Sequence, residues 1–225
     1  MQLGRMGTVV MHSDTESQVE RSAAVAAPAF DPEGPFDPLV DLDGLWTPEL
    51  ADRYLPIPGM PPAKYECLDG KLIMSPREGT ANMFAVWQLG KQLETAADQA
   101  GHHFYLTVNV LLDVQKWIEP DFVVLRRPGH GRMWIPPDDV LLVGECVSRS
   151  SKHNDRVNKP GMCGEAEIPY FMRVEVNYRS RRVEVELLRL ENGKYRTEAV
   201  GSEAERFETD LPFQLSLDPA ELLER

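Results

Sequence analysis

Two acidic residues stand where carboxylates could do chemistry. Glu145 interrupts the apolar run 141–147, where an unpaired buried carboxylate would be strongly unfavourable. Its charge needs compensation by a nearby arginine, by an outward-facing position, or by a metal ion at the strand end. Asp121 follows a proline at the start of a second apolar run, 122–125, although an Asp after Pro is also common in turns.

The pair predicts a metal site. If the two runs form neighbouring strands, their carboxylates lie close together and repel each other unless a cation lies between them. Oxygen ligands suit a hard ion such as Mg²⁺ or Mn²⁺ better than zinc. We therefore expect Asp121 and Glu145 to bind a divalent metal.

The elements that must position these acids indicate a mixed α/β fold. Two short runs around Asp69-Gly70 predict a hairpin with strands at 64–68 and 71–75. Phe84, Trp87, Leu93 and Ala97 recur on one face of a helix expected over 80–100. Further strands are expected at 104–114, 120–125, 141–147, 170–176, 183–190 and 195–200, and a short helix at 219–223.

The chain of 225 residues is long enough for one domain and a tail. Residues 1–44 are rich in Ala, Pro, Asp and Gly and have no sustained periodicity, so they predict a disordered or loosely docked acidic tail. Trp46, Leu50 and Tyr54 then occur at roughly helical spacing. The folded domain is therefore expected over 45–225.

Several protein classes are excluded. No apolar run approaches the roughly 20 residues of a membrane-spanning helix, and the three cysteines form no C-x-x-C pair. We therefore expect a cytoplasmic protein with free thiols and no membrane partner. The sequence also has no glycine-rich phosphate loop, no G-x-S-x-G motif and no H-E-x-x-H motif.

The net charge of -12 argues at first sight against a nucleic-acid partner. Residues 126–160, however, contain seven Lys and Arg against four acids. This basic segment either contacts phosphates or consists of solvated loop charges. Its candidate phosphate contacts are Arg126, Arg149, Lys152 and Arg156.

Five short motifs in order carry a family resemblance. They are Tyr65-Glu66-x-x-Asp69-Gly70-x-Leu72, Pro120-Asp121-Phe-Val-Val, Val143-Gly-Glu145-Cys-Val147-Ser148, Asp155-x-x-x-Lys159 and Ile168-Pro169. The succession resembles the Uma-two family, restriction-endonuclease-like proteins of the PD-(D/E)XK nuclease superfamily. The resemblance extends from about Tyr54 to the C-terminus.

The resemblance implies a restriction-endonuclease-like mixed central sheet flanked by helices, with C-terminal β-hairpins. It also implies catalytic roles for four residues and three metal ligands. Asp121, Glu145 and the backbone carbonyl of Cys146 would bind the metal. Lys159 would be the catalytic lysine, displaced onto the following helix, and Glu66 would be an acid from the first hairpin. Without these roles, Glu66 is an exposed glutamate and Lys159 a solvated helix lysine.

The implied activity is metal-dependent hydrolysis of DNA with Mg²⁺ or Mn²⁺. The metal would lower the pKa of bound water and neutralise charge on the phosphate, and Lys159 would add a positive charge. The four basic residues named above would hold the nucleic-acid backbone without reading bases. A homodimer is expected, because two copies of one site can cut two strands.

Departures from the family pattern support an alternative. Residues 148–151 read Ser-Arg-Ser-Ser in place of Ser-Pro-Ser, and Pro169 is followed by Tyr-Phe in place of Glu-Tyr-Trp. Pro160-Gly161 directly follows Lys159, and proline disfavours helical geometry in the residue before it, which predicts a shortened or displaced helix. The alternative is a weakened nuclease fold that binds DNA or protein. A protein that uses these acids only in surface ion pairs is the third possibility.

Overall fold

The computed structural model describes residues 35–147 and 154–224, which lie in one compact unit, Pro35–Arg225. Of the tail expected over residues 1–44, residues 1–34 lie outside the described residues. Residues 35–44 belong to the compact unit, where Leu39 and Leu42 pack against buried Trp46. In the described ranges, no helix is both long and apolar enough to span a membrane.

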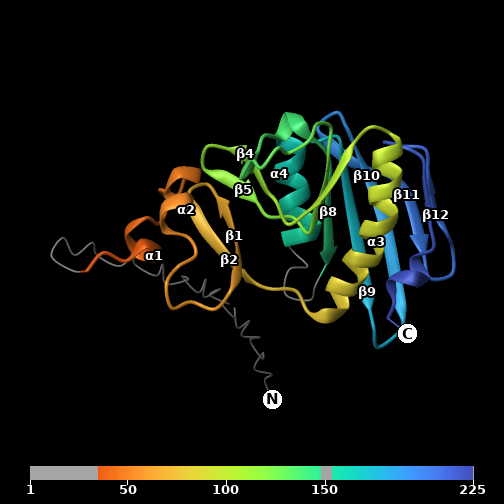
Figure 1. Ribbon diagram of the computed structural model, residues 1–225, viewed down its shortest axis with the longest axis horizontal. Coiled ribbons are helices and arrows are strands. Elements are labelled where there is room, and N and C mark those ends of the chain that lie inside the picture. Colours follow the sequence, from red (N-terminus) through yellow and green to blue (C-terminus); the bar gives the residue numbers. More distant parts are fainter. Residues whose placement is uncertain (1–34, 148–153, 225) are drawn as a thin grey trace, which may run out of the picture. The chain divides into compact units, whose positions relative to one another are not determined.

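A six-stranded mixed sheet forms the centre of the described fold, in the order β11-β10-β9-β8-β6-β3 (Figure 1). Only β8 and β9 pair in parallel, and the other neighbours are antiparallel. The strands are β3 (His103–Leu106), β6 (Phe122–Leu125), β8 (Val140–Val147), β9 (Tyr170–Asn177), β10 (Arg182–Glu191) and β11 (Lys194–Ser202).

A second sheet of five strands has the order β2-β1-β5-β4-β7. Its members are β1 (Ala63–Leu68), β2 (Lys71–Pro76), β4 (Asn109–Asp113), β5 (Lys116–Ile118) and β7 (Trp134–Ile135). A third sheet pairs β12 (Phe207–Thr209) with β13 (Leu215–Leu217). The helices are α1 (Pro38–Asp41), α2 (Pro48–Tyr54), α3 (Thr80–Gln99) and α4 (Lys159–Glu165), with a π-helical turn at Asn154–Asn158 and 3₁₀ turns at Pro137–Asp139 and Pro219–Leu222.

Strand β8 is buried along its whole length because both faces of the sheet are covered. Leu142 and Cys146 join the core beneath α3, whereas Val143 joins the core that includes Met162 and Cys163 of α4. This alternation follows from the two-residue period of a strand. It turns the side chain of Glu145 to the α4 face, the same face as Val143.

The predicted mixed sheet flanked by helices, with C-terminal hairpins, is confirmed. The hairpin around Asp69-Gly70 and the helix over 80–100 also form as expected. The single strand expected over 104–114 is wrong, because the chain breaks at Thr107, which has a φ of 48°. Residues before the break pair in the six-stranded sheet, and those after it pair in the five-stranded sheet.

Candidate active site

Asp121 and Glu145 lie at neighbouring strand ends. Phe122 pairs with Gly144 in the antiparallel β6–β8 ladder, so Asp121, which precedes Phe122, lies next to Glu145, which follows Gly144. Asp121 is 5% exposed and Glu145 is 2% exposed. The Oδ2 atom of Asp121 accepts a hydrogen bond of 2.7 Å from the backbone N–H of Cys146. The two carboxylates are therefore held side by side at the end of a buried strand.

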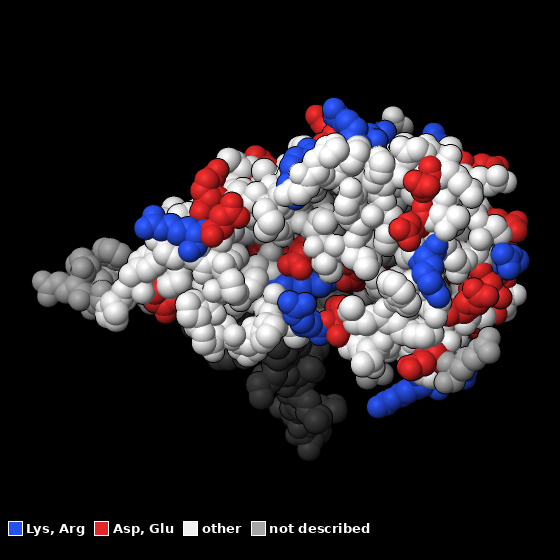
Figure 2. All heavy atoms as spheres, in the orientation of Figure 1, with Lys and Arg blue, Asp and Glu red and all other residues white. Residues whose placement is uncertain are grey.

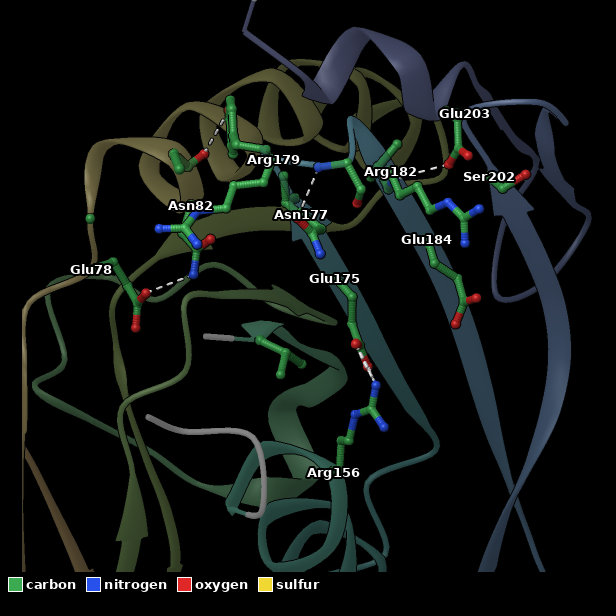
Figure 3. A pocket seen from close by; sticks show the side chains of 17 residues that line it. Glu78, Asn82, Arg156, Glu175, Asn177, Arg179, Arg182, Glu184, Ser202 and Glu203 are labelled. Carbon is green, nitrogen blue, oxygen red and sulfur yellow. Dashed lines mark hydrogen bonds and ion pairs between the residues drawn. The ribbon is translucent and has the colours of Figure 1, made fainter. Parts of the chain in front are cut away.

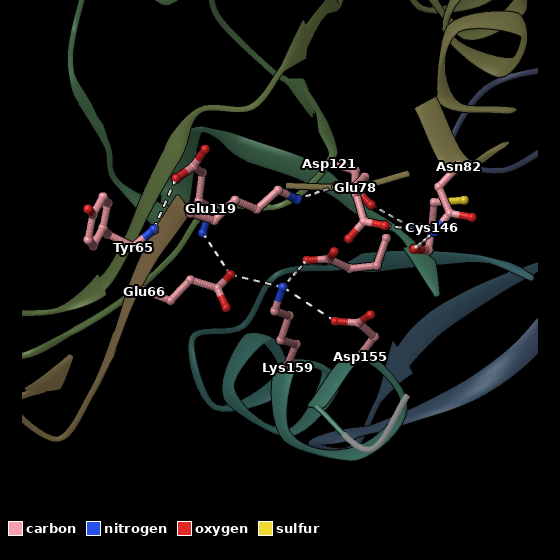
Figure 4. Close-up of polar contacts among 11 residues, drawn as sticks. Tyr65, Glu66, Glu78, Asn82, Glu119, Asp121, Cys146, Asp155 and Lys159 are labelled. Carbon is pink, nitrogen blue, oxygen red and sulfur yellow. Dashed lines mark hydrogen bonds and ion pairs between the residues drawn. The ribbon is translucent and has the colours of Figure 1, made fainter. Parts of the chain in front are cut away.

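Lys159 provides the charge that compensates Glu145. Its Nζ lies 2.8 Å from Glu145 Oε1, 2.9 Å from Glu66 Oε1 and 3.4 Å from Asp155 Oδ1 (Figure 4). All four side chains are at most 5% exposed. Of the compensations considered for Glu145, the structure thus shows an ion pair, with a lysine rather than an arginine.

A shortened or displaced helix was expected at Pro160-Gly161; α4 is short, with seven residues, and Lys159 still contacts Glu145. The chain is helical from Asn154 to Glu165, first as a π-helical turn and then as the short α4. A π-helical turn interrupts the regular hydrogen-bond ladder, so the missing N–H of Pro160 in the first turn of α4 is tolerated. Asp155 and Lys159 consequently lie one turn apart on the face toward Glu145.

Lys64 is a site residue that sequence reasoning missed. It lies on β1, and its Nζ contacts Oδ1 of Asp121. Its side chain is 12% exposed. Lys64 and Glu66 are two residues apart on one strand and share a face, so the alternation around Tyr65 was the signal that could have revealed it.

Glu66 also helps to attach the hairpin. Its Oε1 accepts a 3.0 Å hydrogen bond from the backbone N–H of Glu119, and the Tyr65 N–H donates to Glu119 Oε2 at 3.4 Å (Figure 4). Glu66 is 3% exposed. It is therefore a buried, bonded residue, not an exposed glutamate before a turn.

Asn82 and Glu78 extend the site on the α3 side. The Asn82 amide donates to the carbonyl oxygen of Cys146 at 3.2 Å and to Glu78 Oε2 at 2.8 Å. A carbonyl oxygen has two lone pairs, so Cys146 can still offer one to another partner. Neither residue was predicted from the sequence.

The site carries more negative than positive charge. The four carboxylates of Glu66, Asp121, Glu145 and Asp155 are compensated only in part by the two ammonium groups of Lys64 and Lys159. Burial alone would lower the pKa of Lys159, but the carboxylates of Glu145, Glu66 and Asp155 outweigh it and hold this pKa well above its usual value. Burial raises the pKa of Glu78, and the charge of Asp121 adds to this effect. The shift of Lys159 describes a cation that is held by the carboxylates around it.

The donor atoms suit a hard divalent ion in type. Carboxylate oxygens of Asp121 and Glu145 and the Cys146 carbonyl are the ligands that Mg²⁺ and Mn²⁺ prefer. Within the described residues, however, no three His, Cys, Asp or Glu side chains gather around one point as a ready ligand set. Each of the two acids contacts an ammonium group instead, so an ion bound here would replace a lysine contact.

The predicted basic residues are not brought to one place. Arg126 follows the far end of β6 from Asp121, roughly 16 Å away at the rise of a strand. Arg156 lies nearer the site but is ion-paired with Glu175. Arg149 and Lys152 lie outside the described residues.

A pocket of about 980 Å³ opens beside the site (Figure 3). Glu78 and Asn82 line its α3 side, and Arg179 and Arg182 line it from the β9–β10 turn. Both arginines are exposed, and no ion pair to either of them occurs among the described residues. Elsewhere on the face in Figure 2, acidic and basic side chains are interspersed and form no continuous basic surface.

Comparisons with known proteins identify the family. The model of the Uma2 family, described as "Putative restriction endonuclease", matches residues 51–220. The chain belongs to the Uma2 family. Its membership supports nuclease function and agrees with the resemblance seen in the motifs. A search of curated proteins found no match.

A solved structure supports the Uma2 fold independently. The chain is similar to the crystal structure of a "putative nuclease belonging to DUF820" from Anabaena variabilis. The TM-score is 0.55 and the identity 17%, over 76% of this chain and 98% of the other. This likeness shows that the two chains share the restriction-endonuclease-like fold.

Proposed function

We propose that this protein is a metal-dependent endonuclease that hydrolyses DNA phosphodiester bonds. The observation that carries the proposal is the placement of Asp121 and Glu145 side by side on neighbouring strands, buried among further acids. With the Cys146 carbonyl, these acids would hold Mg²⁺ or Mn²⁺. Membership in the Uma2 family supports this reading.

In the proposed reaction, a water oxygen forms a bond to phosphorus and the bond to the leaving oxygen breaks. One proton leaves the water for solvent, and the leaving oxygen takes one up. An ion held by these ligands would supply positive charge that acidifies water and stabilises the charged transition state. Asp121 is oriented by the Cys146 N–H, and Glu145 is oriented by Lys159, so both acids keep their positions as charge develops.

The pocket next to the acids supports a path for the nucleic-acid strand. Strands β8 and β9 run in parallel, with Cys146 opposite Val174, so β9 continues past the site to the turn at Tyr178. Arg179 and Arg182 at this turn are exposed and line the pocket beside Glu184 and Glu203, so both arginines can contact phosphates. We propose that a DNA backbone crosses this pocket between α3 and the turn.

The test is cleavage of supercoiled and linear DNA by the purified protein with Mg²⁺, Mn²⁺ or EDTA. Asp121→Asn and Glu145→Gln should each reduce metal-dependent cleavage by about 100-fold or more, because each removes a ligand charge. The matched controls Asp98→Asn and Glu205→Gln change exposed acids and should cut like the wild type.

Two other outcomes would change the assignment. Binding of DNA without cleavage in any ion, by a folded protein, would favour the weakened nuclease fold, which the lysine contacts of Asp121 and Glu145 already allow. Light scattering with and without DNA would test the proposed homodimer. A monomer that nicks one strand at a time would contradict the dimer and leave the nuclease proposal standing.

A further inference from the structure

Two lysines contact the acids of the site, and their surroundings differ. Lys159 has three carboxylate oxygens within 3.4 Å and a side chain that is 5% exposed. An ammonium group has three N–H donors and no acceptor. Lys159 therefore faces three buried carboxylates at once, and turning it toward a substrate phosphate would take its charge away from them.

Lys64 has donors to spare. Among the residues that the structure describes, it contacts one carboxylate, that of Asp121. Its side chain is 12% exposed, compared with 5% for Lys159. Of the two lysines, Lys64 is the one that can turn toward a ligand without leaving several buried acids unpaired.

The contact of Lys64 is with the oxygen that a metal ion would need. Oδ2 of Asp121 is held by the backbone N–H of Cys146, whereas Oδ1 contacts Lys64. A divalent ion on Oδ1 would repel the ammonium group, and the bond to Cys146 would keep the carboxylate in place. Ion binding and release of Lys64 are thus coupled.

We propose that Lys64, rather than Lys159, is the lysine that contacts the substrate phosphate. The inference rests on the proposed nuclease function. When an ion takes Oδ1 of Asp121, Lys64 turns to a nonbridging phosphate oxygen and donates a hydrogen bond where negative charge builds. No proton is transferred, and the bonds that form and break are those of the hydrolysis described above. Lys159 remains a fixed positive charge that positions Glu66, Glu145 and Asp155.

The experiment compares Lys64→Met, Lys64→Arg and the control Lys71→Met, which changes an exposed lysine of the same hairpin. Calorimetry with Mn²⁺ in the absence of DNA measures competition for Asp121. Lys64→Met should bind Mn²⁺ about 10-fold more tightly, because a neighbouring positive charge is gone. Lys71→Met should match the wild type, and circular dichroism verifies that every variant is folded.

The second readout is plasmid cleavage at saturating Mn²⁺. Lys64→Met should cut about 100-fold more slowly than the wild type, the size of effect expected for one lost donor to a developing charge. Lys64→Arg should retain part of the rate because a guanidinium also donates to phosphate. Slower cutting together with tighter ion binding distinguishes this role from a general loss of structure.

Each remaining outcome overturns the inference. An unchanged Mn²⁺ affinity in Lys64→Met would show that Lys64 and the ion do not share Asp121. An unchanged cleavage rate would remove Lys64 from the phosphate while the nuclease function stands. If the wild type cuts no DNA, the proposed function fails, and a tighter Mn²⁺ affinity in Lys64→Met would then reduce Lys64 to a counter-ion of Asp121.

Discussion

At the scale of single residues, Lys159 makes more ion pairs than any other charged side chain of the described site. Three buried carboxylates surround it, from β1, β8 and the turn before α4. Removing one partner from a buried ion cluster leaves the others without compensation, which costs more than a surface ion pair contributes. The fold and the site therefore depend on the same side chain.

We expect Lys159→Met to lower the free energy of unfolding by about 3–5 kcal/mol. The reason is that Glu66, Glu145 and Asp155 would lose their shared cation inside the protein. Urea unfolding followed by circular dichroism measures this value. The exposed Lys71→Met should change it by less than about 0.5 kcal/mol, and equal values for the two variants would contradict a structural role for Lys159.

Asp139 gives the fold a separate dependence on pH. It is 4% exposed and is ion-paired with Arg127 at 2.7 Å and Arg132 at 2.6 Å. The hydrogen bond from Arg132 lowers the pKa of Asp139 below its usual 3.8, and the charge of Arg127 contributes. These arginines of the predicted basic segment therefore neutralise an acid of their own segment.

A lowered folded-state pKa means that Asp139 stabilises the protein above its unfolded-state pKa and that this stability is lost as pH falls through the folded-state value. Asp139→Asn should therefore lower the free energy of unfolding by about 2 kcal/mol near neutral pH. The difference from the wild type should shrink as pH falls below 3.8. Urea unfolding across pH measures it, and a difference that stays constant down to the lowest pH would argue against the ion pairs as its source.

At the scale of helices and strands, the sequence predicted those elements whose signal lies within a few neighbouring residues. The Asp69-Gly70 turn and the apolar run around Glu145 each carry their signal within a few residues, and both formed as expected. The division at Thr107 left no such signal, because the residues on both sides favour strands and only the backbone turns. Sequence also could not tell that Arg126, a predicted phosphate contact, follows the end of β6 that is farther from Asp121.

The two central acids of the candidate site could be predicted from the sequence, whereas its lysine contacts could be predicted only in part. Asp121 and Glu145 stand out because charges inside apolar runs are unusual. Lys64 does not stand out, since a lysine at the start of a hairpin is ordinary, and its contact with Asp121 spans 57 positions. Asn82 and Glu78 lie at the start of a helix where polar residues are equally ordinary.

A substitution at Gly144 would test how closely β6 and β8 must approach each other. A Cβ atom at this position would lie 2.0 Å from the ring of Phe122. Gly144→Ala should lower the free energy of unfolding by about 3 kcal/mol and reduce cleavage, because Asp121 and Glu145 flank the clash. Thermal unfolding and plasmid nicking measure both effects.

Gly161 is the matched control for Gly144. A Cβ atom there meets nothing within 4 Å, and alanine favours helix over glycine by about 1 kcal/mol. Gly161→Ala should therefore leave stability unchanged or slightly raised. If Gly144→Ala behaves in the same way, the close contact with Phe122 does not constrain the strands.

At the scale of the whole molecule, an acidic protein is proposed to bind an acidic polymer. The net charge is -12, so non-specific attraction to DNA is weak and local contacts must supply it. The β9–β10 turn brings Arg179 and Arg182 to the pocket beside the acids. Binding should consequently depend on a few phosphate contacts and on salt.

The double variant Arg179→Gln, Arg182→Gln should bind a DNA duplex at least about 10-fold more weakly in Ca²⁺ and should show a smaller salt dependence, because two phosphate contacts are lost. Fluorescence anisotropy at several salt concentrations measures both quantities. Arg196→Gln, an exposed arginine on β11, should bind like the wild type. Equal salt slopes for all three proteins would place the DNA outside the pocket.

The site joins two sheets, and this has a consequence for how the chain folds. Glu145 and Lys159 are 14 positions apart, whereas Lys64 and Asp121 are 57 positions apart. Lys64 lies in the five-stranded sheet, and Asp121 directly precedes β6 of the six-stranded sheet. Closing a longer loop costs more conformational entropy, and long-range contacts form more slowly. During refolding, the β8–α4 pair should form before the first hairpin docks. A newly made chain would thus bury its central strand while Asp121 still lacks its lysine, and the acids would be complete as a group only in the last stage of folding.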